Sequence, residues 1–499
     1  MPDVEEKNVL LPKFDNSYST LPNRFYAKNL PVPVDSPELI ILNEPLANYL
    51  GFESSWLKSS SCVNMFSGNS LPDGTEPLSM AYAGHQFGHW ISCLGDGRAV
   101  LLGEMIATDN KRYDIQLKGS GQTLFSRTGD GRAWIGPIMR EYIVSEAMNA
   151  LGILTTRALA VVTTGEMVLR EKAFPGGIIT RVASSHIRVG TFQYFAARGD
   201  IEGLRILADY TIQRLYPEIM KKRRPYLSFL EVVVSIQAKL IAHWMSVGFI
   251  HGVMNTDNMA ISGETIDYGP CAFMDDYHPD KVFSSIDKRG YYAYRKQNRA
   301  AHWNLVCLAK CLLPLLDENE RKALSLAQQT VDHFSNQYQK SYNKIFGEKI
   351  GLPCPTEDNN KLIFDLLVLM ESHHCDFTHT FYTLSEVHDA EGEDNAFLVL
   401  FNHSTEARRW FKKWRTQIGE TDESLCFAKE IMRMRNPAII PRNHHIDRVI
   451  HQVLESGSFK EFYLMNKALQ NPYSRLNEND IFSSPPLEED KVKYTFCGT

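Results

Sequence analysis

Several features that mark specialised classes of protein are scarce in this sequence. Its 499 residues contain no run of five basic residues, and 53 Lys and Arg against 59 Asp and Glu give a formal net charge of −6. We therefore expect no nucleic acid and no anionic membrane surface as the main partner. No stretch approaches the roughly 18 consecutive apolar residues that cross a bilayer. No membrane partner is expected on this count either.

Paired cysteine motifs and targeting patterns are also missing. The nine cysteines are scattered and form no paired CxxC motif, which predicts mostly buried thiols in a reducing compartment. The first residues show neither the basic and apolar regions of a secretory leader nor the Arg-rich, acid-poor composition of a transit peptide. A cytoplasmic protein is the expectation that follows.

The overall composition is that of an ordinary globular protein, with 43% hydrophobic and 22% charged residues, which excludes disordered and fibrous classes. Along the chain, sequence patterns typical of short strands and turns give way to patterns typical of helices, which predicts an α+β fold of two lobes. Residues 1–70 are interpreted as an extended arm, 71–200 as a small sheet-containing N-lobe, 201–400 as a larger helical C-lobe, and 401–499 as a helical extension that ends in a cysteine tail.

A lysine and two glutamates stand out in the predicted N-lobe. Strands are expected at 99–103 and 113–118; the second alternates apolar and polar residues, and Lys118 ends it. A helix follows, and it carries Glu141 and Glu146. A lysine at a strand end and a glutamate on the next helix are typical of the pair that positions nucleotide phosphates in kinases. Spacing alone does not choose between the two glutamates.

Two glycine motifs and two arginines suit phosphate binding. Gly-Asp-Gly-Arg occurs at 95–98 and again at 129–132; the glycines let backbone N–H groups approach phosphate oxygens, although Asp-Gly is equally typical of a hairpin turn. Strands at 158–162 and 167–170 are expected around a turn. Arg181 and Arg188 share one face if their segment is helical, which suits a terminal phosphate; exposed surface arginines are the alternative.

The predicted C-lobe contains the strongest candidate for an active site. An apolar helix over 227–247 leads to His251-Gly-Val-Met-Asn-Thr-Asp-Asn258, and Ile266-Asp-Tyr-Gly follows. This layout is typical of a kinase-like site, where H-G-D-x-x-x-x-N supplies a base and a metal ligand. Val253 occupies the position of the base. Asp257, Asn258 and Asp267 remain as candidates for chemistry, and an Asx-rich turn is the alternative.

Long motifs give the sequence a specific resemblance to the selenoprotein O (SelO) pseudokinase family. The resemblance runs from Phe14 to Cys497, and its motifs include Tyr82-Ala-Gly-His-Gln-Phe-Gly-His, Leu94-Gly-Asp-Gly-Arg-Ala, Gln116-Leu-Lys-Gly-Ser-Gly-Gln-Thr, Ser126-Arg-Thr-Gly-Asp-Gly-Arg-Ala, His251-Gly-Val-Met-Asn-Thr-Asp-Asn-Met and Ile266-Asp-Tyr-Gly-Pro. It implies a protein kinase-like fold that binds ATP flipped relative to true kinases. It also implies transfer of AMP to Ser, Thr or Tyr hydroxyls of proteins.

The resemblance also assigns roles to individual residues. It implies a base at Asp257, metal ligands for Mg²⁺ or Mn²⁺ at Asn258 and Asp267, and a Lys118–Glu141 pair. Nucleotide contacts are implied for Gly95, Gly97, Arg98, Lys118, Asp130, Gly131, Arg181, Arg188 and Asp267. A flipped nucleotide gives a reason for Val253, because the α-phosphate would then be the reacting centre.

The C-terminal tail departs from the family pattern. Cys497 stands where eukaryotic relatives carry selenocysteine, but Gly498 and Thr499 follow where two serines are expected. The resemblance implies a redox partner near the metal-binding segment; the aligned position is Phe283, and Cys271 is close by but not aligned. A redox role for Cys497 is therefore an open question.

Two other functions compete with AMP transfer. A small-molecule or protein kinase is the alternative in another reaction class, and Val253 counts against it. A non-catalytic ATP-binding scaffold is the other, and the retention of Lys118, Asn258 and Asp267 together counts against that. Target proteins, oligomeric state and the choice between Mg²⁺ and Mn²⁺ do not follow from the sequence.

Overall fold

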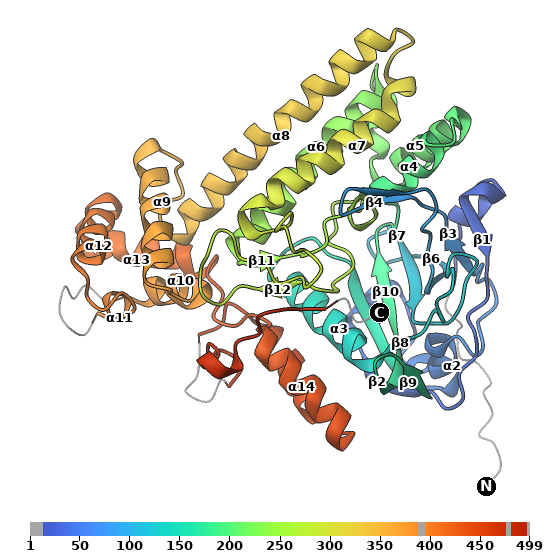
Figure 1. Cartoon of the computed structure of the whole chain (residues 1–499), viewed down its shortest axis with the longest axis horizontal. Helices are drawn as coiled ribbons and strands as arrows, with labels where there is room; N and C mark the ends of the chain where they lie inside the picture. Colours follow the sequence, from blue (N-terminus) through green and yellow to red (C-terminus); the bar gives the residue numbers. More distant parts are fainter. Residues whose placement is uncertain (1–12, 388–394, 476–480, 497–499) are drawn as a thin grey trace.

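The computed structural model describes residues 13–387, 395–475 and 481–496. Figure 1 shows the strands gathered on one side of the molecule and the long helices on the other, with further helices beyond the end of α8. The predicted α+β fold, with a sheet-containing lobe followed by a helical lobe, is confirmed.

The N-terminal lobe is built on one antiparallel sheet of eight strands. The strand order is β1-β3-β6-β7-β10-β9-β2, and β8 pairs with β10 beside this path. The strands are β1 (Tyr26–Lys28), β2 (Glu38–Leu42), β3 (Leu78–Met80), β6 (Ala99–Ile106), β7 (Arg112–Lys118), β8 (Ala133–Trp134), β9 (Arg157–Leu169) and β10 (Ala173–Ala183). Short pairs β4 (Gly84–Gln86) with β5 (His89–Ile91), and β11 (Phe249–Ile250) with β12 (Ala272–Phe273), lie outside it.

The segment expected to be an extended arm is part of this lobe. From residue 13 onward it supplies β1 and β2 to the sheet, together with α1 (Glu44–Leu50) and α2 (Ser60–Ser67). Leu46, Trp56 and Phe66 are buried in a core that includes residues of β6, β7 and β10. Despite its Pro- and Ser-rich composition, the segment from residue 13 to 70 is therefore ordered by packing on the sheet.

The turn expected at 163–166 is wrong, because β9 runs through it without reversing. Pro175 pairs with Met167 and Gly177 with Thr163, so three residues of β9 bulge opposite one residue of β10. Gly165 has φ +74, a backbone conformation that favours glycine. The glycine thus marks a bulge in a long strand instead of a hairpin.

The structure contains both helices that the sequence predicted next to the candidate site. The helix with the two glutamates is α3 (Ile135–Ala150), and the apolar helix is α6 (Pro225–Ser246). The others are α4 (Val189–Ala196), α5 (Ile201–Leu215), α7 (Gln297–Leu316), α8 (Glu320–Lys349), α9 (Glu357–Ser372), α10 (Phe377–Glu386), α11 (Ala396–Val399), α12 (Thr405–Ile418), α13 (Asp422–Arg433), α14 (Asn443–Ser456) and α15 (Lys460–Leu469).

Helix α6 is the central helix of the second lobe. Among the described residues it alone is long and apolar enough to cross a membrane by length and composition, a test that core helices of soluble proteins also pass. Phe229, Val233 and Ile241 are fully buried in the main core. Figure 1 shows α6 alongside α7 and α8. Packing within the protein thus accounts for its apolar face.

The C-terminal helices and tail pack back on both lobes. Phe462 of α15 contacts Tyr142 of α3, with ring centroids 5.7 Å apart. Near the end of the chain, the Thr495 amide donates to the Phe283 carbonyl at 2.8 Å, and its hydroxyl donates to the Pro270 carbonyl at 2.6 Å. The tail therefore lies against the segment that follows Asp267.

Candidate active site

A cleft of about 560 Å³ gathers residues from both lobes. One wall comes from the sheet and the glycine motifs, and the other comes from the loop at 251–258 and the segment at 265–269. Among the candidates from the sequence, those that line it are Gly95, Gly97, Arg98, Lys118, Asp130, Gly131, Arg181, Arg188, Asp257, Asn258 and Asp267. Residues separated by up to 172 positions, such as Gly95 and Asp267, thus share one cavity.

The lysine at the end of β7 pairs with the first of the two glutamates. Lys118 Nζ lies 2.6 Å from Glu141 Oε2 and 3.3 Å from Asp267 Oδ1, and all three groups are largely buried. Glu146 pairs with Arg157 at 2.8 Å instead. The structure therefore selects Glu141, the choice that spacing left open.

Asp267 is the electrostatic centre of the cleft. It contacts Lys118, Arg181 and, at 3.4 Å, Arg188. Burial raises the pKa of its carboxyl, but the charges of Arg181, Lys118 and Arg188 prevail and hold this pKa well below its usual value. Its φ is +64, a backbone conformation that is uncommon outside glycine but tolerated by Asp and Asn. The carboxylate is therefore permanently charged at neutral pH.

The two arginines do not share a helical face as expected. Arg181 lies in strand β10, opposite Gln116, and Arg188 precedes α4 as its N-cap residue. Both still point toward Asp267, because the chain bends between them. Arg188 also donates to the Asp257 carbonyl at 3.0 Å and lies 4.5 Å above the Tyr82 ring. Both arginines are buried, so the alternative of exposed surface arginines is wrong. Their role at a terminal phosphate stays a prediction.

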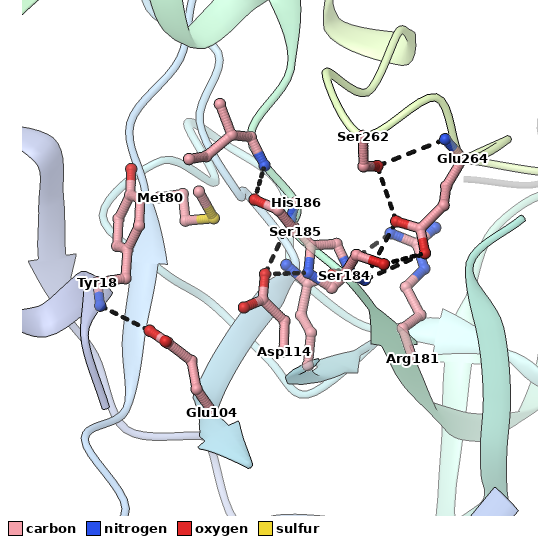
Figure 2. A network of polar contacts seen from close by, with 12 residues as sticks. Tyr18, Met80, Glu104, Asp114, Arg181, Ser184, Ser185, His186, Ser262 and Glu264 are labelled. Atoms are coloured by element: carbon pink, nitrogen blue, oxygen red, sulfur yellow. Dashed lines mark hydrogen bonds and ion pairs between the residues drawn. The ribbon is translucent and has the colours of Figure 1, made fainter. Parts of the chain in front are cut away.

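Two buried carboxylates hold the bend between these arginines. Figure 2 shows Ser184 and His186 between Glu264 on one side and Asp114 on the other. Glu264 accepts from the Ser184 hydroxyl at 2.9 Å and from its amide at 3.1 Å. Asp114 accepts from the His186 amide at 2.8 Å and from its Nδ1 at 2.9 Å. This clamp fixes the positions from which Arg181 and Arg188 reach the cleft.

Asp257 lies on the same wall as Asp267 but in a different environment. Its Oδ2 accepts from Gln86 Nε2 at 3.1 Å, and its Oδ1 is buried without a hydrogen-bond partner among the described residues. Burial raises the pKa of this carboxyl to about 6; the hydrogen bond from Gln86 opposes the rise. A carboxylate with an unpaired oxygen and a pKa near neutrality is suited to accept a proton.

The loop that carries Asp257 is held by a histidine and an asparagine. His251 Nε2 donates to the Ile266 carbonyl at 2.9 Å, and its Nδ1 accepts from the Val253 amide at 3.3 Å. Asn258 Nδ2 donates to the Val253 carbonyl at 2.9 Å, which leaves its side-chain oxygen as an acceptor. Val253 itself lines the cleft. The position of the usual kinase base therefore has no ionisable group.

The glycines of the two repeated motifs are explained by packing. A Cβ on Gly95 would lie 2.2 Å from the Phe125 ring, and one on Gly131 would lie 2.1 Å from the Gly121 carbonyl oxygen. Both residues also have positive φ. Any larger residue would displace the loops that form the edge of the cleft. The glycines shape the cavity, and no direct contact with a phosphate is needed to account for them.

The acidic residues of the two motifs differ. Asp96 is buried and accepts from the Met80 amide at 3.1 Å, whereas Asp130 is about half exposed and pairs with Arg170 at 2.8 Å. Arg170 also lines the cleft, and the sequence gave no signal for it because it lies in no motif. Tyr82 and Gln86 were visible within the Tyr-Ala-Gly-His-Gln motif, but no role could be assigned to them.

The cleft offers oxygen ligands that suit a hard divalent cation. Asp257, Asn258 and Asp267 line the same cavity, and the Asn258 side-chain oxygen is left as an acceptor. Mg²⁺ in nucleotide enzymes usually takes one or two carboxylates together with substrate phosphates. Among the described residues no cluster of three or more His, Cys, Asp or Glu forms a complete metal cage. The donor set fits a cation that arrives with a nucleotide.

The tail cysteine lies outside the described residues. Chain up to Phe496 is described, and Thr495 bonds to Phe283 and Pro270, next to the predicted redox segment. Phe283 is buried, as is Cys271. The geometry that would bring Cys497 to either position is not described, so its redox role stays a prediction.

Comparisons with known proteins agree with one another. The profile of the family described as "Protein adenylyltransferase SelO" matches residues 8–470. A protein nucleotidyltransferase YdiU of Agrobacterium fabrum is 51% identical over 487 residues, covering 98% of this chain and 100% of the relative. One from Geobacillus kaustophilus is also 51% identical, over 98% of this chain and 99% of the relative. With this coverage and the kinase-like cleft, the chain belongs to the SelO family of protein adenylyltransferases.

Proposed function

We propose that this protein transfers AMP from ATP to hydroxyl side chains of other proteins and releases diphosphate. The observation that carries the proposal is the contrast within the loop at 251–258. Val253 occupies the kinase base position, and Asp257 presents an unpaired carboxylate oxygen whose pKa is raised to about 6. A base is thus present, but it is displaced from the place that serves γ-phosphate transfer.

The charge of the cleft supports a triphosphate as the nucleotide. Among the described residues that line it, seven are cationic and four are carboxylates, and the cations are Arg98, Lys118, Arg127, Arg132, Arg170, Arg181 and Arg188. In a cleft this excess of positive charge favours a polyanion. We assign Lys118, Arg181 and Arg188 to phosphate oxygens, with Arg181 and Arg188 at the γ-phosphate of an ATP that is bound flipped relative to true kinases.

A divalent cation completes the proposed substrate complex. Asn258 and Asp267 would hold Mg²⁺ or Mn²⁺, which would neutralise phosphate charge and polarise the reacting phosphoryl group. Lys118 is positioned by Glu141, and Asp267 is positioned by the three cations around it. These contacts preorganise the phosphate-binding wall before the nucleotide enters.

The chemical step uses Asp257 as the base. The acceptor hydroxyl oxygen forms a bond to the α-phosphorus, and the bond from that phosphorus to the bridging oxygen of the β-phosphate breaks. The hydroxyl proton passes to the Asp257 carboxylate, and diphosphate leaves with the negative charge. Gln86 holds the Oδ2 atom of this carboxylate at 3.1 Å.

Labelled ATP tests the reaction class directly. Purified protein is incubated with a protein acceptor and ATP labelled at the α- or, separately, at the γ-phosphate. Label from the α position alone supports AMP transfer, whereas label from the γ position alone identifies a kinase. The Asp257→Asn variant is the matched control, because it keeps the shape of the site and removes the base. If the wild type bound nucleotide but transferred no label, the non-catalytic ATP-binding scaffold would be the remaining hypothesis.

The cellular location is also a proposal. Cys93, Cys354 and Cys426 are exposed and form no disulfide, and Cys62, Cys307, Cys311 and Cys375 are buried. Exposed, unbridged thiols fit a reducing compartment. We therefore propose a cytoplasmic protein whose partners are ATP and proteins, with no nucleic acid and no membrane.

A further inference from the structure

A second cavity opens beside the nucleotide cleft. It has a volume of about 660 Å³ and is bordered by the tip of the β4–β5 hairpin, the loop at 251–258 and the start of α7. Phe87 lines both this groove and the nucleotide cleft. The two cavities are therefore neighbours, separated by the hairpin tip.

The groove is bonded directly to the loop that carries the proposed base. Asn255 Oδ1 accepts from the Phe87 amide at 3.0 Å and from the Tyr292 hydroxyl at 2.8 Å. Gln86, the residue before Phe87, donates to Asp257. Phe87 has φ +50, a backbone conformation that is strained for an aromatic residue. These bonds hold one wall of the groove in fixed relation to Asp257.

The lining of the groove is typical of a protein-binding surface. Four aromatic residues contribute to it: Phe87, Tyr291, Tyr292 and Trp303. Tyr291 is 47% exposed and Trp303 is 42% exposed. Trp and Tyr are among the residues most enriched at binding hot spots, and here four aromatic residues gather in one groove.

The charges at the groove have one sign. Lys296 and Arg299 line it, and none of the described residues that line it is acidic. Lys296 donates to the Gly290 carbonyl at 3.0 Å, which leaves it two further hydrogens. The Arg299 guanidinium has no ion pair in the part of the chain that the structure describes, and the residue is exposed. Both cations are available to an acidic ligand.

We propose that this groove binds the acceptor polypeptide. An extended segment of the target protein would place an aromatic or large aliphatic side chain between Phe87, Tyr292 and Trp303, and an acidic side chain beside Lys296 and Arg299. Its hydroxyl residue would then pass the hairpin tip and reach Asp257. The inference rests on the proposed AMP transfer, which needs a second substrate at Asp257 while the nucleotide fills the first cleft.

Two observations favour an acceptor polypeptide over other occupants. The groove adjoins the nucleotide cleft: Phe87 lines both cavities, and its amide donates to Asn255, which lines the cleft. Its two cations complement an acidic segment, whereas its open aromatic rings suit apolar side chains. A second copy of this chain is the other candidate, and it becomes an outcome of the test.

A peptide library with charge reversal tests the electrostatic part. Peptides with a central Ser, Thr or Tyr and varied flanking residues are incubated with the protein and α-labelled ATP. The wild type is expected to favour acidic and aromatic flanking residues by at least about tenfold in kcat/KM. Lys296→Glu with Arg299→Glu should shift the preference to basic peptides. Arg321→Glu, an exposed arginine at the start of α8, is the matched control and should leave the preference unchanged.

Removal of an aromatic side chain tests the apolar part. Trp303→Ala should raise the KM for the favoured peptide at least about tenfold while the KM for ATP stays unchanged. Phe364→Ala is the control, because Phe364 is an exposed aromatic residue on α9, outside the groove. An unchanged preference in the charge variants and an unchanged KM in Trp303→Ala would overturn the proposal.

The possible outcomes distinguish a failure of the proposed peptide-binding groove from a failure of the proposed AMP transfer. A wild type that modifies intact proteins but no peptide would overturn a short extended segment as the occupant. A dimer in sedimentation that Trp303→Ala dissociates would assign the groove to a second copy and also overturn the proposal. A wild type that transfers no label to any acceptor would instead remove the proposed function itself.

Discussion

The two loops that form the C-lobe wall of the cleft each contribute one aspartate, and their surroundings give them opposite properties. Asp267 lies among Lys118, Arg181 and Arg188, and its pKa is held well below the usual value. Asp257 is more deeply buried, has one hydrogen bond to a neutral amide, and has a pKa of about 6. The same side chain therefore serves as a fixed charge in one loop and as a proton acceptor in the other.

The comparison shows which property separates a ligand from a base. A metal ligand must be charged at every working pH, and nearby cations ensure this for Asp267. A base must be able to take a proton, which needs burial without a strong positive partner. Asp267 also lies close enough to raise the pKa of Asp257 further. The two loops thus act on each other as well as on the substrate.

The largest effect is expected when the fixed charge is removed. Asp267→Asn keeps the side-chain shape and suits the positive φ, but it leaves Lys118, Arg181 and Arg188 without their shared anion. AMP transfer with Mg²⁺ should fall by more than about 10³-fold, because a bound metal ion supplies several kcal/mol of transition-state stabilisation and the variant loses the carboxylate that would hold it. Transfer assays across Mg²⁺ concentrations measure it.

Nucleotide binding without metal distinguishes this variant further. The three cations of Asp267→Asn should bind ATP in EDTA at least as tightly as the wild type does, because the phosphates replace the missing carboxylate. Calorimetric titration with ATP and EDTA checks this. Near wild-type turnover in Mg²⁺ would place the metal site elsewhere.

Removal of the proton acceptor should have the next largest effect. Asp257→Asn keeps the bond length and the contact with Gln86 but cannot accept a proton. AMP transfer should fall by about 10²–10⁴-fold, the usual contribution of a positioned base. The Kd for ATP should change less than about twofold. Equal loss of binding would show that Asp257 acts as a metal ligand, and the difference between the two loops would disappear.

The pH dependence tests the difference between the loops without changing the nucleotide wall. Below pH 6 the Asp257 carboxyl is protonated and cannot act as a base, so kcat/KM should fall about tenfold per pH unit below that point and level off above it. In Asp257→Asn the residual activity should not show this fall below pH 6. A fall that persists in the variant would be caused by the titration of another group.

The stability of the fold should also depend on the protonation of Asp257, but it should fall over the pH range in which activity rises. Because its pKa is raised in the folded state, Asp257 contributes stability below about pH 4, and this contribution is lost as the pH rises through about 6. Asp257→Asn should therefore be more stable than the wild type at pH 8, by on the order of 3 kcal/mol at most, and show little gain near pH 4. Thermal melts at the two pH values measure the gain.

The sequence predicted the parts of this site that depend on local pattern. Alternation located the strand that ends at Lys118, and the apolar period located α6 before the loop at 251–258. It could not choose Glu141, because Glu141 and Glu146 lie on one helix and only the orientation of α3 against the sheet decides which one meets Lys118. The choice is a property of packing and not of spacing.

Other parts depended on contacts between distant segments. Arg181 and Arg188 meet at Asp267 because Asp114 and Glu264 hold the bend between them. The local sequence does not predict these two contacts. The sequence predicts a turn around Gly165 where the structure has a bulge, because glycine is favoured in both. Asp257 was a candidate, but its raised pKa comes from burial, which a sequence does not display.

A smaller effect is expected from the arginines that hold Asp267. Substitution of Arg181 and Arg188 by Ala should reduce the preference for ATP over AMP by roughly 10- to 10²-fold for each guanidinium, since such charged contacts contribute about 1.5–3 kcal/mol. Arg188→Lys, which keeps the charge, should lose less. Titrations with ATP, ADP and AMP measure the preference, and equal weakening of all three would place these side chains away from the γ-phosphate.

The smallest effect is expected where a kinase-like base is restored. Val253→Asp puts a carboxylate at the position that kinases use, on the same wall as Asp257 and Asp267. The flipped nucleotide presents its α-phosphate to this wall, so no label should transfer from γ-labelled ATP. Val253→Asn carries the same packing cost without the charge, and the two variants should retain AMP transfer within about tenfold of each other. Appearance of γ-phosphate transfer in Val253→Asp alone would show that the nucleotide is not flipped, and the loops would then differ for a reason other than the orientation of ATP.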